Sequence, residues 1–158
     1  MTHVLAAVRA LNRLELVSEA LRHALDSLAV AHPTWLRANA QAAWAERYAR
    51  RAEDARLPKS KEGREERARA VGCDGVALLT ALRADTAPGW LRELPAVETL
   101  RRVWVQNYHR ADDSIRWRAA DDIPRAATFI SSPYDPDAHL AKKRTTTWVG
   151  YVRSNVAC

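Results

Sequence analysis

The acidic side chains of this 158-residue chain come mainly in pairs, and such pairs are the first candidates for chemistry. The pairs in the C-terminal half are Asp112 with Asp113, Asp121 with Asp122, and Asp135 with Asp137. Phosphoryl transfer with two metal ions needs carboxylates that converge from separate elements, whereas neighbouring acids point in different directions. These pairs therefore predict polar turns and caps of the backbone. We predict no catalytic residue and no metal-binding residue in the chain.

Other common catalytic patterns are also missing from the sequence. His109 and His139 have no Cys or Glu at the spacing of a zinc site. No serine stands in a glycine-flanked nucleophile elbow, and none of the five glycines belongs to a phosphate-binding loop. We therefore expect no cofactor in this chain.

Clusters of basic residues are the stronger signal, because they can neutralise phosphates. Lys and Arg number 25 against 19 Asp and Glu, which gives a formal net charge of +6. The candidate DNA-binding residues are Arg47, Arg50, Arg51, Arg101, Arg102, Lys142, Lys143 and Arg144. For Arg50 and Arg51 an alternative stays open, since the nearby acids Glu46, Glu53 and Asp54 could pair with them on a solvated helix face.

Helical periodicity indicates which elements carry these residues. Apolar residues at steps of three and four from Leu5 to Leu28 predict one long amphipathic helix. Pro33 ends it, and Thr34 is expected to cap a second helix that contains Trp44 and Tyr48.

Two more helical regions follow. The charged segment 61–71 predicts a solvated helix that Gly72 stops, with Asp74 capping a short helix after it. A further helix is expected from Pro95 to about His109. The tryptophans on the apolar sides of these helices should pack in the core, and they are Trp35, Trp44, Trp90 and Trp104.

The C-terminal part of the chain differs in character. Prolines and turn residues without helical period predict a loop-rich linker over residues 111–144. Residues 145–152 are a mix of β-branched and aromatic types, which favours a strand, here one without a partner. We therefore predict a mainly α fold: a helical region over residues 1–110, the linker, and one orphan β-strand within residues 145–158.

Cysteine usage and the N-terminus bear on location. Cys73 and Cys158 match neither a metal site nor the dense disulfide framework of small secreted proteins, which favours the cytoplasm. Arg9, Arg13 and Glu15 interrupt the apolar N-terminal stretch before a signal peptide or membrane span could form. We expect no membrane partner.

Several stretches resemble bacterial insertion-sequence transposases with a DDE, RNase H-like catalytic domain. They are TWLRANAQAAWAERYARR, GCDGVALLTAL, LPAVETLRRVWVQNYHR and ISSPYDPDAHLAKKRTTTWVGY, in that order between about Pro33 and Tyr151. In that family these segments form the helical region and linker ahead of the catalytic domain. The Trp-x-Gly-Tyr run then enters the first catalytic strand.

The family pattern continues with a lysine and a strand that ends on the first catalytic aspartate, but here residues 152–158 read VRSNVAC. The resemblance therefore implies an N-terminal fragment truncated at the start of the catalytic domain, within residues 145–158. Such a fragment is not an enzyme as a free chain, and the Mg²⁺ of the intact family enzyme is not expected in it.

Without the catalytic domain, the resemblance implies that only a binding role remains for this chain. It implies a role in DNA transposition limited to holding transposon ends or a second protomer. The alternative is a helical interaction module, or an inert remnant, that interferes with an intact transposase by pairing with it.

Overall fold

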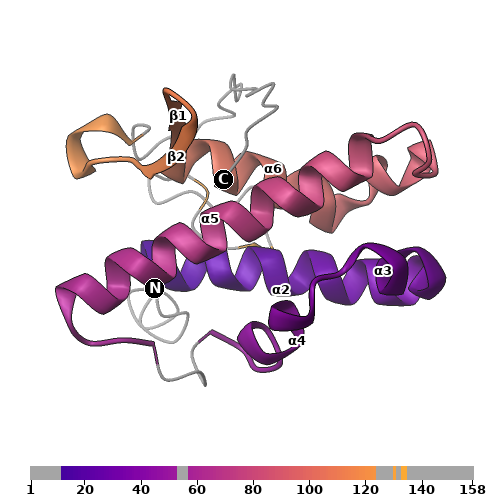
Figure 1. Cartoon of the computed structure of the whole chain (residues 1–158), viewed down its shortest axis with the longest axis horizontal. Helices are drawn as coiled ribbons and strands as arrows, with labels where there is room; N and C mark the ends of the chain where they lie inside the picture. The colour runs from indigo at the N-terminus through magenta and orange to yellow at the C-terminus, as the bar shows by residue number, and fades with distance from the viewer. Residues whose placement is uncertain (1–11, 53–56, 124–129, 131–132, 135–158) are drawn as a thin grey trace, which may run out of the picture.

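The fold is mainly α-helical, as the computed structural model of the chain shows for residues 12–52, 57–123, 130 and 133–134. Its three long helices are α2 (Arg13–Ala31), α5 (Lys61–Arg83) and α6 (Pro95–Asn107). The helix α2 packs most extensively against α6 and also contacts α5 (Figure 1). Buried leucines of α2, among them Leu21 and Leu28, face this core, which confirms an amphipathic helix here. The helix begins at Arg13, with Asn12 as its extended N-cap, and not at Leu5 as predicted.

The predicted second helix is two short helices, α3 (Pro33–Asn39) and α4 (Ala42–Arg47). Ala40 and Gln41 adopt extended conformations between them. Trp35 and Trp44 are nine residues apart, so one straight helix would place them on opposite faces. The break lets both tryptophans be buried. Thr34 is not the cap of α3; the His32 side chain accepts the Trp35 N–H at 3.2 Å instead.

The expected stop at Gly72 is also wrong, because α5 runs without interruption through Gly72 and Gly75. Aromatic side chains from the end of α6 pack directly on these two glycines. Trp104 Nε1 donates to the carbonyl of Gly72 at 3.0 Å, and the Tyr108 hydroxyl donates to the carbonyl of Ala68 at 2.6 Å. The glycines thus allow a close helix contact, and Asp74 lies inside the helix rather than at its cap.

The predicted linker begins with a β-hairpin. Strand β1 (Tyr108–Ala111) pairs antiparallel with β2 (Ser114–Trp117), and Tyr108 lies opposite Trp117. The turn between them contains Asp112 and Asp113, with Asp112 at a φ of 53°, so this acidic pair turns the backbone as expected. The hairpin spans the predicted boundary between the helical region and the linker at residue 110. Its second strand belongs to the packed helical region, since Ile115 is buried and β2 packs against α5.

Helix α6 begins at Pro95, as predicted. Two short 3₁₀ helices, η1 (Gly89–Glu93) and η2 (Ala120–Asp122), complete the regular structure that the described residues contain. Trp90 of η1 is 49% exposed and stacks against His32, so it is not the core residue that was expected. Within the described ranges no helix is long and apolar enough to cross a membrane. The predicted strand at residues 145–152 lies outside these ranges.

Candidate nucleic-acid interface

Arg47, the first of the predicted phosphate contacts, is held in an internal ion pair. Its guanidinium pairs with the buried carboxylate of Asp74 on α5, and the Tyr48 hydroxyl donates to the same carboxylate at 2.6 Å. Burial raises the pKa of Tyr48, and the nearby charge of Asp74 raises it further, so the hydroxyl stays a donor. Arg47 therefore ties α4 to α5 and has its charge largely compensated within the protein.

Arg50 and Arg51 follow α4 in a turn whose two ends are fixed. Tyr48 holds one end through Asp74, and at the other end the Ala52 N–H donates to Glu19 of α2 at 2.9 Å. Both arginines are exposed. Arg50 has no hydrogen-bond or ion-pair partner among the described residues. We call residues 48–52 the arginine turn.

The N-terminal half of α5 adds basic residues that were predicted to lie on a solvated helix face and to pair with acids. Arg67 Nη2 donates to the carbonyl of Arg47 at 2.9 Å, which brings this part of α5 beside the arginine turn. Arg64 lies one turn earlier and is exposed, so it shares a face of α5 with Arg67. The signal available in the sequence was the spacing of three residues between Arg64 and Arg67, which places two arginines on one helix face.

Glu19 is the buried carboxylate that organises this region from α2. Besides Ala52 it accepts hydrogen bonds from Arg22, at 2.7 Å and 3.0 Å, and from the hydroxyl of Tyr134. Burial alone would raise the pKa of Glu19, but these hydrogen bonds outweigh burial and hold the pKa below its ordinary value. Glu19 therefore stays ionised at neutral pH.

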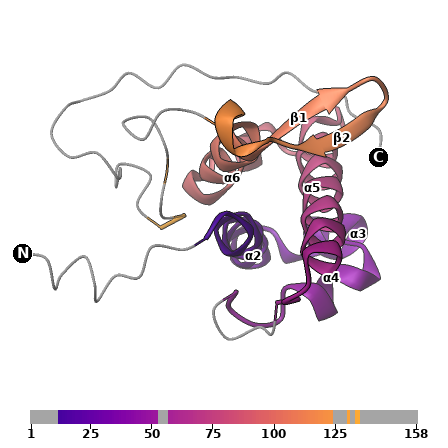
Figure 2. The ribbon, with the colours of Figure 1, turned by 90° about the vertical axis from the view of Figure 1, so that its left-hand side faces the viewer.

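Arg101 and Arg102, which were also predicted to contact phosphates, are not brought to the same surface. Arg101 Nη2 lies 2.6 Å and 2.7 Å from the two carboxylate oxygens of Glu98, and Arg102 is partly buried beside it on α6. In both views α6 and α4 lie on opposite sides of α2 (Figures 1 and 2). Lys142, Lys143 and Arg144 lie outside the described residues.

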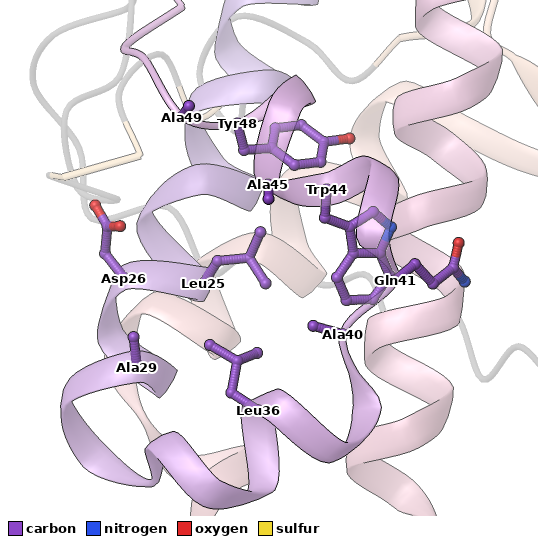
Figure 3. A pocket seen from close by; sticks show the side chains of 10 residues that line it. All are labelled: Leu25, Asp26, Ala29, Leu36, Ala40, Gln41, Trp44, Ala45, Tyr48 and Ala49. Carbon is purple, nitrogen blue, oxygen red and sulfur yellow. The ribbon is translucent and has the colours of Figure 1, made fainter.

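An apolar pocket of about 290 Å³ is lined by residues of α2, α3 and α4 (Figure 3). Leu25, Leu36 and the ring of Trp44 line it, together with small alanine side chains. Tyr48, the first residue of the arginine turn, also lines the pocket. The arginine turn is thus anchored by polar contacts and borders this apolar pocket.

Among the residues that the structure describes, the acids show no arrangement that would gather a metal ion. Asp122 pairs with Arg118 at 2.9 Å, and Asp112 and Asp113 form the hairpin turn. In the part of the chain that the structure describes, no group of three His, Cys, Asp or Glu side chains lies close enough to hold a cation. Asp135, Asp137 and His139 lie outside that part.

The fold and this surface define a small, mainly helical unit that presents arginines on an anchored turn. Comparison of the chain with protein families, with characterised proteins and with solved structures gives no match.

Proposed function

We propose that the chain binds DNA through the arginine turn and the adjoining half of α5, as the helical front region of an insertion-sequence transposase of the DDE type. The observation that carries this proposal is the exposure of Arg50 and Arg51 on a turn that Tyr48 and Ala52 fix at both ends. A fixed turn loses little conformational freedom when its arginines contact phosphates. The net charge of +6 favours the same kind of partner.

The proposed role is binding without catalysis. We assign no catalytic residue to this chain, and Mg²⁺ belongs to the intact family enzyme. The ligand that the resemblance suggests is the end of a transposon, and the proposed location is the cytoplasm, where bacterial DNA is accessible.

The test is the salt dependence of binding to a fluorescent DNA duplex, measured by anisotropy. With about five phosphate contacts, the slope of log affinity against log salt should be about −4 to −5. Replacing Arg50 and Arg51 together by Gln should reduce the steepness of that slope by about 2. A slope near zero for the unchanged chain would exclude DNA binding through phosphates.

A charge-matched control is available at the far end of α5. Arg83 and Arg92 are exposed, and Arg83 is about 28 Å along the helix from Arg64. Replacing both by Gln removes the same charge as the double substitution in the turn. The proposal requires a clearly smaller change in slope for this control, and equal changes would reduce the effect to net charge.

A second candidate function is pairing with another protomer, either a second copy or an intact transposase. The pocket between α2 and α4 favours it, because an apolar recess can accept a side chain from a partner. Light scattering across a range of concentrations tests this, with Ala29→Arg as the blocking variant, since Ala29 is exposed at the pocket. A single monomer mass at every concentration would exclude self-pairing.

A further inference from the structure

One carboxylate joins three parts of the chain that are far apart in sequence. Glu19 lies on α2, Ala52 closes the arginine turn, and Tyr134 belongs to the Ser-Ser-Pro-Tyr-Asp motif. The two oxygens of Glu19 divide these contacts: Oε2 accepts from Ala52, and Oε1 accepts from Arg22 and Tyr134. The side chain of Glu19 is 5% exposed, so water cannot easily replace a lost partner.

The position of Tyr134 is set by more than its hydroxyl. Its ring contacts His23 edge-on, with ring centroids 4.8 Å apart. Ile130, four residues before Tyr134, is held by two hydrogen bonds to Gln106. The Gln106 side chain donates to the Ile130 carbonyl at 2.9 Å and accepts the Ile130 N–H at 3.0 Å. Residues 130 and 134 are therefore each bound to a helix by specific polar contacts, Ile130 to α6 and Tyr134 to α2.

We propose that Glu19 is a positioning residue that couples the seating of Tyr134 to the geometry of the arginine turn. Glu19 does not touch the bound DNA; it fixes the Ala52 amide, and with it the backbone that carries Arg50 and Arg51. When the Tyr134 hydroxyl is bound to Glu19, both oxygens of the carboxylate are held and the turn is fixed. When Tyr134 leaves, Oε1 loses one of its two partners and the turn loosens. This inference rests on the proposed DNA binding of the turn.

The charged neighbours support this arrangement from α2 itself. Arg22 donates to Oε1 of Glu19 and at 2.6 Å to Asp26, so it orients Glu19 without competing with the Ala52 N–H for Oε2. Arg22 also donates to the hydroxyl oxygen of Tyr134 at 2.9 Å. The Tyr134 hydroxyl is therefore bound by the Glu19–Arg22 pair. The second oxygen of Glu19, Oε2, binds the Ala52 amide of the arginine turn.

The decisive variant is Glu19→Gln, because coupling and simple electrostatics predict opposite signs for it. The substitution removes one negative charge and so raises the net charge of the chain by one, which by itself should strengthen DNA binding. A glutamine has one acceptor oxygen and cannot accept from Ala52 and Arg22 as Glu19 does. We expect DNA binding to weaken by about two- to ten-fold, the cost of ordering a loosened turn.

Glu98→Gln is the matched control, since it makes the same change in charge on α6, away from the turn. We expect its DNA binding to be unchanged or tighter. Tyr134→Phe keeps the ring against His23 but removes the hydroxyl, and its affinity should lie between those of the unchanged chain and Glu19→Gln. Tighter binding by Glu19→Gln, or equal binding by Tyr134→Phe and the unchanged chain, would overturn the coupling.

A second readout separates this inference from the proposed function. Hydrogen exchange of the Ala52 amide, measured by NMR on the full chain without DNA, reports directly on its bond to Glu19. We expect faster exchange at Ala52 in Glu19→Gln and in Tyr134→Phe, with slow exchange retained in the core of α6. Unchanged exchange at Ala52 would refute the coupling whether or not the chain binds DNA. Fast exchange in the variants together with no DNA binding by the unchanged chain would refute the proposed function, and with it the role of Glu19 in binding.

Discussion

The ring of Tyr108 lies directly against Gly72, where a Cβ atom would come within 2.6 Å of the ring carbon Cε1. The Tyr108 hydroxyl donates to the carbonyl of Ala68, one turn earlier on the same helix. The glycine thus lets the start of the hairpin pack on α5, and that contact positions the part of α5 that precedes it. Arg64 and Arg67 belong to that part.

Gly72→Ala should destabilise the protein although alanine is the better helix former. The added methyl group would meet three atoms of a fully buried ring, which places its cost in the upper part of the range of about 1 to 3 kcal/mol, above the gain of about 1 kcal/mol in helix propensity. Urea denaturation followed by tryptophan fluorescence measures the change. Gly89→Ala is the control, because the nearest atom to its Cβ would be the flexible end of Arg92, at 3.5 Å. A Gly72→Ala variant that is as stable as the unchanged chain would contradict the packing of Tyr108.

Arg47→Gln should reduce stability without changing the salt dependence of DNA binding. It leaves the buried Asp74 carboxylate with one fewer charged partner, and we expect a loss of about 2 kcal/mol in the free energy of unfolding. Arg47 is partly exposed, so the loss should lie below that of a fully buried pair. Denaturation and anisotropy on the same variant check both expectations. If the salt slope falls by about 1, Arg47 is a phosphate contact and the ion pair opens on binding.

Glu19 should make the stability of the protein depend on pH in the acid range. The folded state holds the pKa of Glu19 below its ordinary value of 4.5, so folding favours the ionised form. This contribution is complete above the ordinary value and is lost as the pH falls below it through the pKa of the folded state. The Glu19→Gln variant has no ionisable group at this position, so it lacks this pH-dependent contribution to stability. The difference in unfolding free energy between the unchanged chain and Glu19→Gln should therefore shrink from about pH 6 to about pH 3. A difference that stays constant over this range would show that the carboxylate has the same pKa in both states.

Periodicity in the sequence was sufficient to predict helices α2 and α6. The leucines of α2 and the apolar positions of α6 recur at helical steps, and a helix that must bury one face shows this pattern locally. The start of α6 at Pro95 is also confirmed. It was predictable from residue type, because proline fits the first turn of a helix without losing a hydrogen bond. The turn formed by Asp112 and Asp113 was likewise predictable from residue type.

Contacts between segments far apart in sequence decided the rest. Gly72 reads as a helix stop until Tyr108, 36 residues later, is seen packed on it. Whether a glycine ends a helix or admits a ring depends on that partner, and residue type alone cannot say which. The same holds for Arg47, which is one of several similar arginines in the sequence and is distinguished only because Asp74 faces it.

The sequence by itself therefore determined the helical class, the excess of positive charge and the residues available for binding phosphates. Only the tertiary structure decided that Arg47 is compensated internally, that Arg50 and Arg51 stand on a turn fixed at both ends, and that Glu19 links this turn to Tyr134. The physical reason is that composition and periodicity are properties of neighbouring residues. The use of each charge depends on which distant group lies within hydrogen-bonding distance of it.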